Sequence, residues 1–337
     1  MPNLHELENA MPVAPLKIIA LPSAEKMGRR INDYMVEFRK SIHNDKVKND
    51  PAFHGYIESN YLVDVDVPRF GSGEAKAQIS ETIRGKDLFI LTDVCNHSIT
   101  YNMNGYTNHM SPDAHDPRVQ NSTPLNGFDN FTTPYQFIKS LLNSEDDMIV
   151  DKDHLLVISP DEGALDRAIY FASVLGVDTG MFYKRRDYST IVNGKNPIVA
   201  HEFLGDNIEG KDIIIIDDMI SSGGSMLDTA KQLKAMKARR VYICCTFGLF
   251  TDGLKNFDVA YEHGDFDKVI TTNLTYLPPE IYTRPYFVEA DMSKFIASLI
   301  DFMNHDASLS NVMATTEKIH GIVEAYNNRT EMSEFHF

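Results

Sequence analysis

Two adjacent carboxylates and a run of serines and glycines follow an apolar segment in the second half of the chain. The apolar segment is Ile213 to Ile216, the acids are Asp217 and Asp218, and the small residues run from Ser221 to Ser225. Glycines let backbone N–H groups approach a phosphate closely, and a helix N-terminus adds unpaired donors and partial positive charge. Paired acids accept hydrogen bonds from sugar hydroxyls or hold a hydrated Mg²⁺. The pattern predicts a binding loop for a sugar phosphate with a metal ion.

Simpler interpretations of this loop exist. A Gly-Gly turn between a strand and a helix is common in doubly wound folds, and an acid at a strand end often caps the next helix. Four apolar residues directly before two adjacent acids favour phosphate binding. The segment is not a Walker loop, because the Lys-Ser/Thr ending is absent, and it is not a Rossmann fingerprint.

The elements expected around this loop alternate between strand and helix. Strands that alternate with helices indicate a parallel sheet with helices on both faces, so the fold class is α/β. Ala168, Phe171 and Ala172 recur at helical spacing after one of the strands. The strands expected in this half are Leu155 to Ser159, Ile213 to Asp217, Val241 to Phe247 and Val269 to Thr272, and a helix is expected from Pro134 to Leu142.

The first half of the chain contains fewer regular elements. A strand is expected from Leu16 to Leu21, followed by a helix that Ser23 could cap. A second strand is expected from Asp87 to Thr92, and its continuous apolar run predicts burial on both faces. From Cys95 to Thr133 the periodicity is lost, and a loop of about forty residues is far longer than the usual 4–6. This stretch is either a functional lid or the place of a missing segment.

Composition limits the functional classes. The chain has 337 residues, enough for two domains or one large α/β unit, and its net charge of −16 argues against general nucleic-acid binding. Cys95, Cys244 and Cys245 do not form a disulfide pattern and are expected to be small buried apolar residues in a reducing cytoplasm. No apolar run is long enough to span a membrane, and the N-terminus has no signal-peptide pattern.

Several segments together resemble the ribose-phosphate pyrophosphokinases, also called phosphoribosyl pyrophosphate synthetases, which have the type I phosphoribosyltransferase fold. The binding loop is similar to one that both pyrophosphokinases and phosphoribosyltransferases carry. The resemblance spans roughly residues 15 to 305. The segments that favour the pyrophosphokinases are Arg69 to Glu74, Glu81 to Asp87, Ser159 to Arg167, Lys184 to Arg186, Asn207 to Lys211 and Thr271 to Asn273.

The resemblance implies two phosphoribosyltransferase-like domains, each a parallel sheet flanked by helices. Residues 1–145 would form an incomplete N-terminal domain on the ATP side, residues 146–310 the domain with the ribose 5-phosphate loop, and residues 311–337 a tail. The implied reaction transfers the pyrophosphoryl group of ATP to the 1-hydroxyl of ribose 5-phosphate, with Mg²⁺, and yields phosphoribosyl pyrophosphate and AMP. Family members form homo-oligomers, because the ATP site is shared between subunits.

The resemblance also implies roles for individual residues. Lys184 and Arg186 would neutralise charge on the moving pyrophosphoryl group, and His115 and Asp161 would help to bind Mg²⁺. The ribose hydroxyls and the 5-phosphate would be held by Asp217, Asp218, Ser221, Ser222, Gly223, Gly224 and Ser225, and the ATP contacts would come from Phe70, Ser72 and Glu74.

The chain departs from the family pattern in two places. Ser221 stands where many members have Asp. About fifty residues are missing between Asp113 and Ala114. This position lies within the stretch from Cys95 to Thr133, which is already longer than a usual loop. Such a gap would expose apolar sheet edges and remove part of the nucleotide site. The alternatives are therefore a non-catalytic sugar-phosphate-binding or regulatory homologue, and a phosphoribosyltransferase, for which no base-specific element is found.

Overall fold

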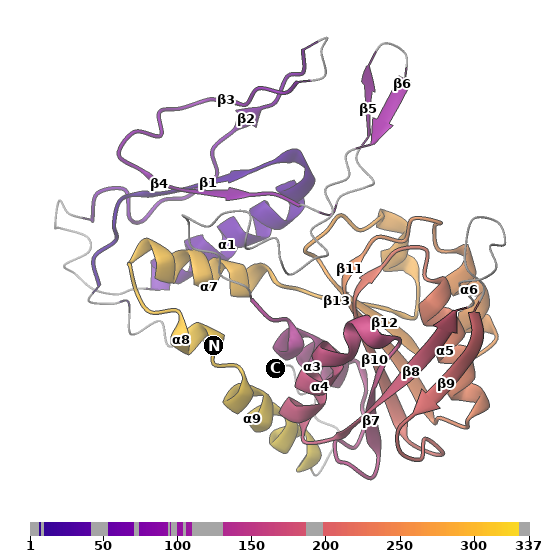
Figure 1. Cartoon of the computed structure of the whole chain (residues 1–337). Helices are drawn as coiled ribbons and strands as arrows, with labels where there is room; N and C mark the ends of the chain where they lie inside the picture. Colours follow the sequence, from indigo (N-terminus) through magenta and orange to yellow (C-terminus); the bar gives the residue numbers. More distant parts are fainter. Residues whose placement is uncertain are drawn as a thin grey trace. The chain divides into compact units, whose positions relative to one another are not determined.

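The computed structural model divides the chain into two compact units, each assembled from separate segments of the sequence (Figure 1). Unit 1 comprises Met1–Phe131, Asn273–Tyr276 and Asp291–Thr315, and unit 2 comprises Thr132–Thr272, Leu277–Ala290 and Thr316–Phe337. The contiguous domain boundaries expected from the sequence remain a prediction. The structure describes residues 7, 10–41, 53–70, 74–93, 95, 100–103, 106–109, 131–186 and 198–329.

Unit 2 is built on a seven-stranded sheet in the order β13-β12-β11-β10-β7-β8-β9. Neighbouring strands are parallel except for β8 and β9, which pair antiparallel at one edge. The bounds are β7 Leu155–Ser159, β8 Asp178–Arg186, β9 Ile198–Leu204, β10 Asp212–Ile220, β11 Arg240–Gly248, β12 Lys268–Thr272 and β13 Phe287–Ala290. The expected α/β fold with a parallel sheet is confirmed, whereas β8, β9 and β13 were not predicted.

Helices cover both faces of this sheet (Figure 1). Ile213 and Ile215 of β10 pack into one core with α5 and α6, and Ile214 and Ile216 pack into the opposite core with α3, α4 and α9. Each of these four side chains is at most 1% exposed, because successive residues of a strand point to opposite faces. The helix bounds are α3 Pro134–Ser144, α4 Leu165–Leu175, α5 Gly224–Ala235, α6 Lys255–Glu262 and α9 Thr316–Asn327.

Unit 1 contains a two-stranded parallel sheet of β1 and β4, with helices α1 and α7. Apolar residues of β1, α1 and α7 form its main core. The bounds are β1 Leu16–Ala20, α1 Glu25–Ser41, β2 Val65–Asp66, β3 Gln78–Ile79, β4 Asp87–Leu91, β5 Thr100–Met103, β6 Tyr106–His109, α7 Ser293–Asn304 and α8 Ser310–Met313.

A buried charge fastens α1 to α7. The guanidinium of Arg39 is fully buried and donates to the Asp301 carboxylate at 2.8 and 3.1 Å and to Asn304 Oδ1 at 2.6 Å. It also lies 4.2 Å from the ring centroid of Tyr56. Because a buried cation needs several partners, this arrangement specifies how the two helices pack in unit 1.

Three expectations for unit 1 are wrong. Ser23 does not cap α1; its hydroxyl oxygen accepts from the N–H of Asp93 at 3.3 Å. The strand from Asp87 is confirmed, but it is only partly buried, and Ile90 is 60% exposed, because β1 alone pairs with β4 among the described residues. Within the stretch expected to lack regular structure, β5 and β6 form an antiparallel hairpin.

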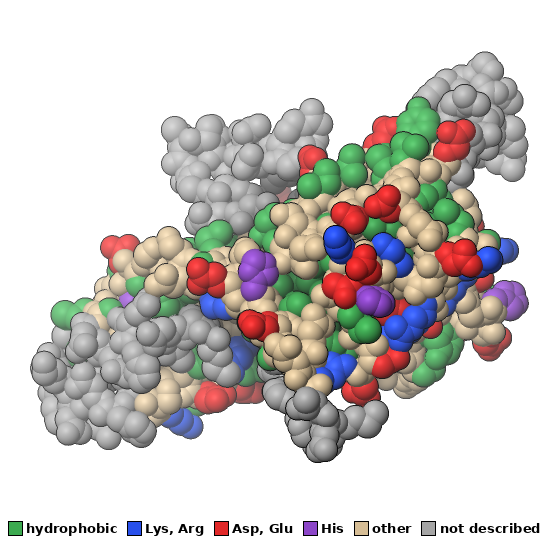
Figure 2. All heavy atoms as spheres, turned by 90° about the horizontal axis from the view of Figure 1, so that it is seen from below, with side chains coloured by type: hydrophobic (Ala, Val, Ile, Leu, Met, Phe, Trp, Pro, Cys, Tyr) green, Lys and Arg blue, Asp and Glu red, His purple; other side chains and the backbone are tan. Residues whose placement is uncertain are grey.

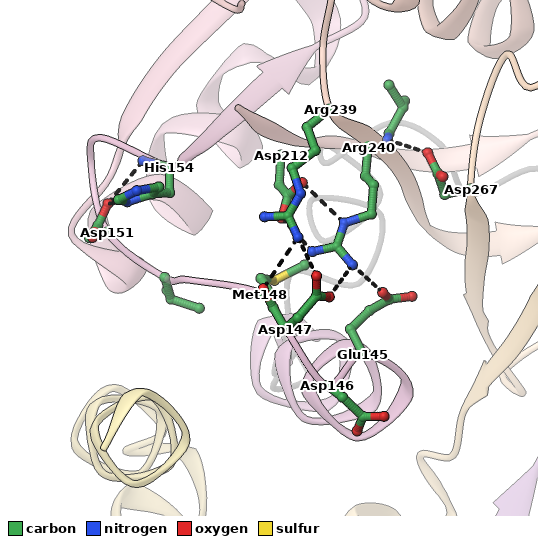
Figure 3. A network of polar contacts seen from close by, with 12 residues as sticks. Glu145, Asp146, Asp147, Met148, Asp151, His154, Asp212, Arg239, Arg240 and Asp267 are labelled. Atoms are coloured by element: carbon green, nitrogen blue, oxygen red, sulfur yellow. Dashed lines mark hydrogen bonds and ion pairs between the residues drawn. The ribbon is translucent and has the colours of Figure 1, made fainter. Parts of the chain in front are cut away.

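At the N-terminal ends of the unit 2 strands, acids and arginines form a tight network (Figure 3). Arg240 donates to both carboxylate oxygens of Asp212 at 2.8 and 3.1 Å, to Glu145 at 2.7 Å and to Asp147 at 2.6 Å. Arg239 also donates to Asp147. Asp212 is buried, so its charge depends on these partners.

Other features agree with the composition. The three cysteines are buried, as expected. In the face drawn in Figure 2, acidic and basic side chains lie beside one another rather than in separate patches. None of the described helices is both long and apolar enough to cross a membrane.

Candidate active site

The acidic pair lies near the C-terminal end of β10, on the side of the sheet where open α/β folds bind ligands. The strand predicted from Ile213 is confirmed and continues to Ile220. Asp217 is 21% exposed and Asp218 is 17% exposed. The backbone N–H of Asp218 donates to Asp217 Oδ1 at 2.9 Å.

Crowding of negative charge changes the protonation of this pair. Burial, together with the neighbouring Asp218 carboxylate, raises the pKa of Asp217 to about 7. The charge of Asp161 contributes to the same increase. A raised pKa identifies acids that are held together at a cost, which is a common property of functional sites.

The small-residue loop leads directly into α5. Gly223 adopts φ +83°, and a Cβ at this position would lie 2.3 Å from the Phe257 ring, so a glycine is required. Ser221 is tied to the loop after β11, because its carbonyl accepts from the N–H of Thr251 at 3.0 Å. Ser221 and Ser225 are exposed, and Gly224 and Ser225 begin the helix, where backbone N–H groups have no partner within the helix.

Asp161 and Arg167 extend the site from the neighbouring strand β7. Asp161 caps the short turn Glu162–Ala164, where its Oδ1 accepts from the N–H of Gly163 at 3.0 Å. This is the capping role that an acid after a strand can have. Arg167, on α4, lies 3.7 Å from Asp217 Oδ1 and 3.7 Å from Asp218 Oδ1.

The other expected site residues are described to different degrees. Phe70 and Glu74 lie in unit 1, where the N–H of Phe70 donates to the carbonyl of Glu74 at 2.8 Å, and Phe70 is 55% exposed. Lys184 and Arg186 lie on β8, opposite His201 and Ile198 of β9. Ser72 and His115 lie outside the described residues, as do the side chains of Lys184 and Arg186.

The oxygen donors at the ends of β7 and β10 suit a hard cation. Within the described part of the chain, no group of three or more His, Cys, Asp or Glu side chains could hold a metal ion. Mg²⁺ does not need such a cage, because it binds through one or two carboxylates together with waters and substrate phosphates. Asp161 and the acidic pair supply the carboxylate oxygens that such an ion uses.

The contributions of two residues to the site were not predicted from the sequence. Arg167 was noted within a motif, but fifty residues separate it from Asp217, so its contact with both acids could not be read from spacing. Phe257 is the reason for glycine at position 223. The helical spacing from Asp161 to Ala168 was the available signal for Arg167, since it places α4 directly after β7.

Family models and a solved structure define the fold class of this chain. A family model described as the phosphoribosyl transferase domain matches residues 135–260, and one described as the N-terminal domain of ribose phosphate pyrophosphokinase matches residues 16–108. The structure of phosphoribosylpyrophosphate synthetase from Mycobacterium smegmatis aligns with a TM-score of 0.57 at 16% identity, over 87% of this chain and 99% of that chain. The fold is therefore that of the phosphoribosyltransferase class.

Curated relatives agree with the matched models. A ribose-phosphate pyrophosphokinase from Thermococcus kodakarensis is 39% identical over 98 residues, which is 29% of this chain and 32% of that relative. One from Vibrio parahaemolyticus is 25% identical over 305 residues, covering 74% of this chain and 90% of the relative. The chain belongs to the ribose-phosphate pyrophosphokinase family.

The same alignments support a missing internal segment. The Vibrio alignment is 305 positions long, but 74% of 337 residues is about 250 residues, so about 55 positions have no residue in this chain. The Thermosipho africanus alignment, 244 positions over 57% of the chain, leaves about 50 such positions. The size agrees with the expected gap, whose place between Asp113 and Ala114 lies outside the described residues.

Proposed function

We propose that this chain is a ribose-phosphate pyrophosphokinase that transfers the pyrophosphoryl group of ATP to the 1-hydroxyl of ribose 5-phosphate. The observation that carries the proposal is the acidic pair Asp217–Asp218 at the end of β10, followed by the small-residue loop and the N-terminus of α5. Relatives bearing the name ribose-phosphate pyrophosphokinase support it.

The proposed ribose 5-phosphate site uses two kinds of group. Asp217 and Asp218 accept hydrogen bonds from the ribose hydroxyls, because ionised carboxylates are strong acceptors for vicinal O–H groups. The N–H groups from Gly223 to Ser225 and the hydroxyls of Ser221 and Ser222 donate to the 5-phosphate. The sugar is thereby oriented for attack, and most of the catalysis in such reactions comes from positioning and charge.

The proposed nucleotide side rests on residues whose contacts remain predictions. Lys184 and Arg186 neutralise the charge of the transferred pyrophosphoryl group, and Phe70, Ser72 and Glu74 contribute to the ATP site. His115 and Asp161 hold Mg²⁺, which supplies electrostatic shielding of the phosphates when it is bound. We also propose that the chain forms a homo-oligomer in the cytoplasm. Light scattering after gel filtration measures the number of subunits.

The test follows both products from the purified chain. The protein is mixed with Mg-ATP and ribose 5-phosphate, and phosphorus NMR records phosphoribosyl pyrophosphate and AMP. Equal formation of the two products is expected. Lys184→Ala should slow their formation by about 100-fold or more, because a charge that stabilises the transition state is lost. Lys152→Ala, at an exposed lysine between α3 and β7, is the matched control and should keep the full rate.

Other results would separate the alternatives. AMP without phosphoribosyl pyrophosphate would indicate hydrolysis of the nucleotide instead of transfer. If no product forms but ribose 5-phosphate binds in calorimetry, the chain is a non-catalytic sugar-phosphate-binding homologue instead of an enzyme.

A further inference from the structure

The guanidinium of Arg167 lies near both members of the acidic pair. Its Nη1 atom lies 3.7 Å from Oδ1 of Asp217 and 3.7 Å from Oδ1 of Asp218. The side chain is 40% exposed, so it borders the site rather than the core.

The backbone position of Arg167 is fixed by its helix. The next residue, Ala168, and Phe171 are fully buried, and Ala172 is 1% exposed, so this face of α4 is locked onto the sheet. The helix begins directly after the turn that Asp161 caps at the end of β7. Since β7 pairs with β10, the first turn of α4 lies beside the acidic pair.

The distance from Arg167 to the acids distinguishes this contact from a structural ion pair. Hydrogen bonds from nitrogen to oxygen are about 2.7–3.2 Å long, so 3.7 Å is an electrostatic contact rather than a hydrogen bond from Arg167. Arg240, in contrast, donates at 2.6–3.1 Å to its acids. Arg167 therefore compensates the charge of the two acids without itself donating a hydrogen bond to either Oδ1 atom.

The charges at the site make such compensation necessary. Asp161, Asp217 and Asp218 bring three carboxylates together at the ends of β7 and β10. A sugar phosphate adds up to two further negative charges when it binds the adjacent loop. One guanidinium at 3.7 Å from both acids reduces this repulsion and favours one orientation of the two carboxylates.

We infer that Arg167 is a positioning residue of the sugar-phosphate site, which orients the Asp217 and Asp218 carboxylates and offsets their charge so that an anionic pentose phosphate can bind. The identity of the ligand rests on the proposed function. The inference adds a residue that acts through the acids rather than by direct contact with the reacting atoms.

The test compares three variants in steady-state kinetics with each substrate varied separately. Arg167→Met should raise the KM for ribose 5-phosphate by about 10–100-fold, the usual effect of removing a residue that orients binding groups, and leave the KM for ATP nearly unchanged. Arg167→Lys should recover most of the loss, because it restores the charge. Arg29→Met, at an exposed arginine on α1, is the control and should behave like the unaltered chain.

Three results would overturn the inference: an unchanged KM for ribose 5-phosphate in Arg167→Met, equal changes for both substrates, or no recovery in Arg167→Lys. Arg167→Gln replaces the Met variant if that variant does not fold. Calorimetric titration with ribose 5-phosphate alone separates this inference from the proposed function. If the unaltered chain makes no product, weaker binding by Arg167→Met still supports the role of Arg167, whereas equal binding, or no binding by the unaltered chain, overturns it.

Discussion

The two ends of the unit 2 sheet hold the same kinds of residue in opposite arrangements. At the N-terminal ends, Arg240 donates short hydrogen bonds to Asp212, Glu145 and Asp147 (Figure 3). At the C-terminal ends, Asp217 and Asp218 lie together and Arg167 stays 3.7 Å from each. Acids are satisfied at one end and crowded at the other.

This difference separates stability from function. A satisfied network lowers the free energy of the folded state, and the hydrogen bond from Arg240 lowers the pKa of Asp147, although burial raises the pKa of Glu145 in the same network. A crowded pair raises that free energy, as the raised pKa of Asp217 indicates. Such crowding is retained where a ligand can relieve it. Mutations at the N-terminal ends of the strands should therefore change mainly stability, and mutations at the C-terminal ends should change mainly activity.

The largest effect is expected at the satisfied end. Arg240→Met leaves the buried Asp212 carboxylate without its main partner, so the free energy of unfolding should fall by about 3–5 kcal/mol. Urea denaturation measures this change. The KM for ribose 5-phosphate of the folded fraction should stay the same. A stable Arg240→Met variant would contradict the assignment of this network to stability.

At the acidic pair, a mutation should lower activity rather than stability. Asp218→Asn removes an ionised acceptor of the proposed sugar site, so product formation should fall by about 100-fold or more while the chain remains folded. Phosphorus NMR and circular dichroism on the same sample report both quantities. A destabilised variant with normal activity would assign Asp218 to the core instead.

The proposed site and the fold were predictable from the sequence to different extents. The apolar run before two acids specified β10 and its loop, because both signals are local in the chain. The ion pairs of Arg167 were not predictable, since they depend on how α4 lies against β10. The burial of β4 was wrongly predicted because it depends on the number of neighbouring strands, which an apolar run does not encode.

A smaller effect should appear in the pH dependence of stability. The folded-state pKa of Asp217 is raised to about 7, above its ordinary value of 3.8, so the native state binds a proton that the unfolded state lacks between these values. Stability from this group is therefore lost as pH rises, by up to about 1.4 kcal/mol per pH unit. Asp217→Asn should remove this slope.

Thermal unfolding of the Asp217→Asn variant and the unaltered chain at pH 5 and pH 8 provides the measurement. The variant should gain in melting temperature relative to the unaltered chain as the pH increases. The same difference at both pH values would show that the acid is ionised throughout.

The smallest effect is expected for an isolated exposed pair. Lys237 and Glu209 are 2.8 Å apart, but their side chains are 71% and 59% exposed. Lys237→Met should change the free energy of unfolding by less than about 1 kcal/mol, because solvent screens the pair. Urea denaturation beside Arg240→Met gives the contrast between one exposed pair and a network. Equal losses of unfolding free energy in Lys237→Met and Arg240→Met would contradict this contrast.

The segmented composition of the two units has a consequence for dissecting the protein. The chain passes between the units after Phe131, Thr272, Tyr276, Ala290 and Thr315. A protease that cuts one of these connections leaves the units joined by the other four. A chimera that exchanges one unit must replace three separate stretches of the coding sequence, so a simple fusion at one boundary would divide both units.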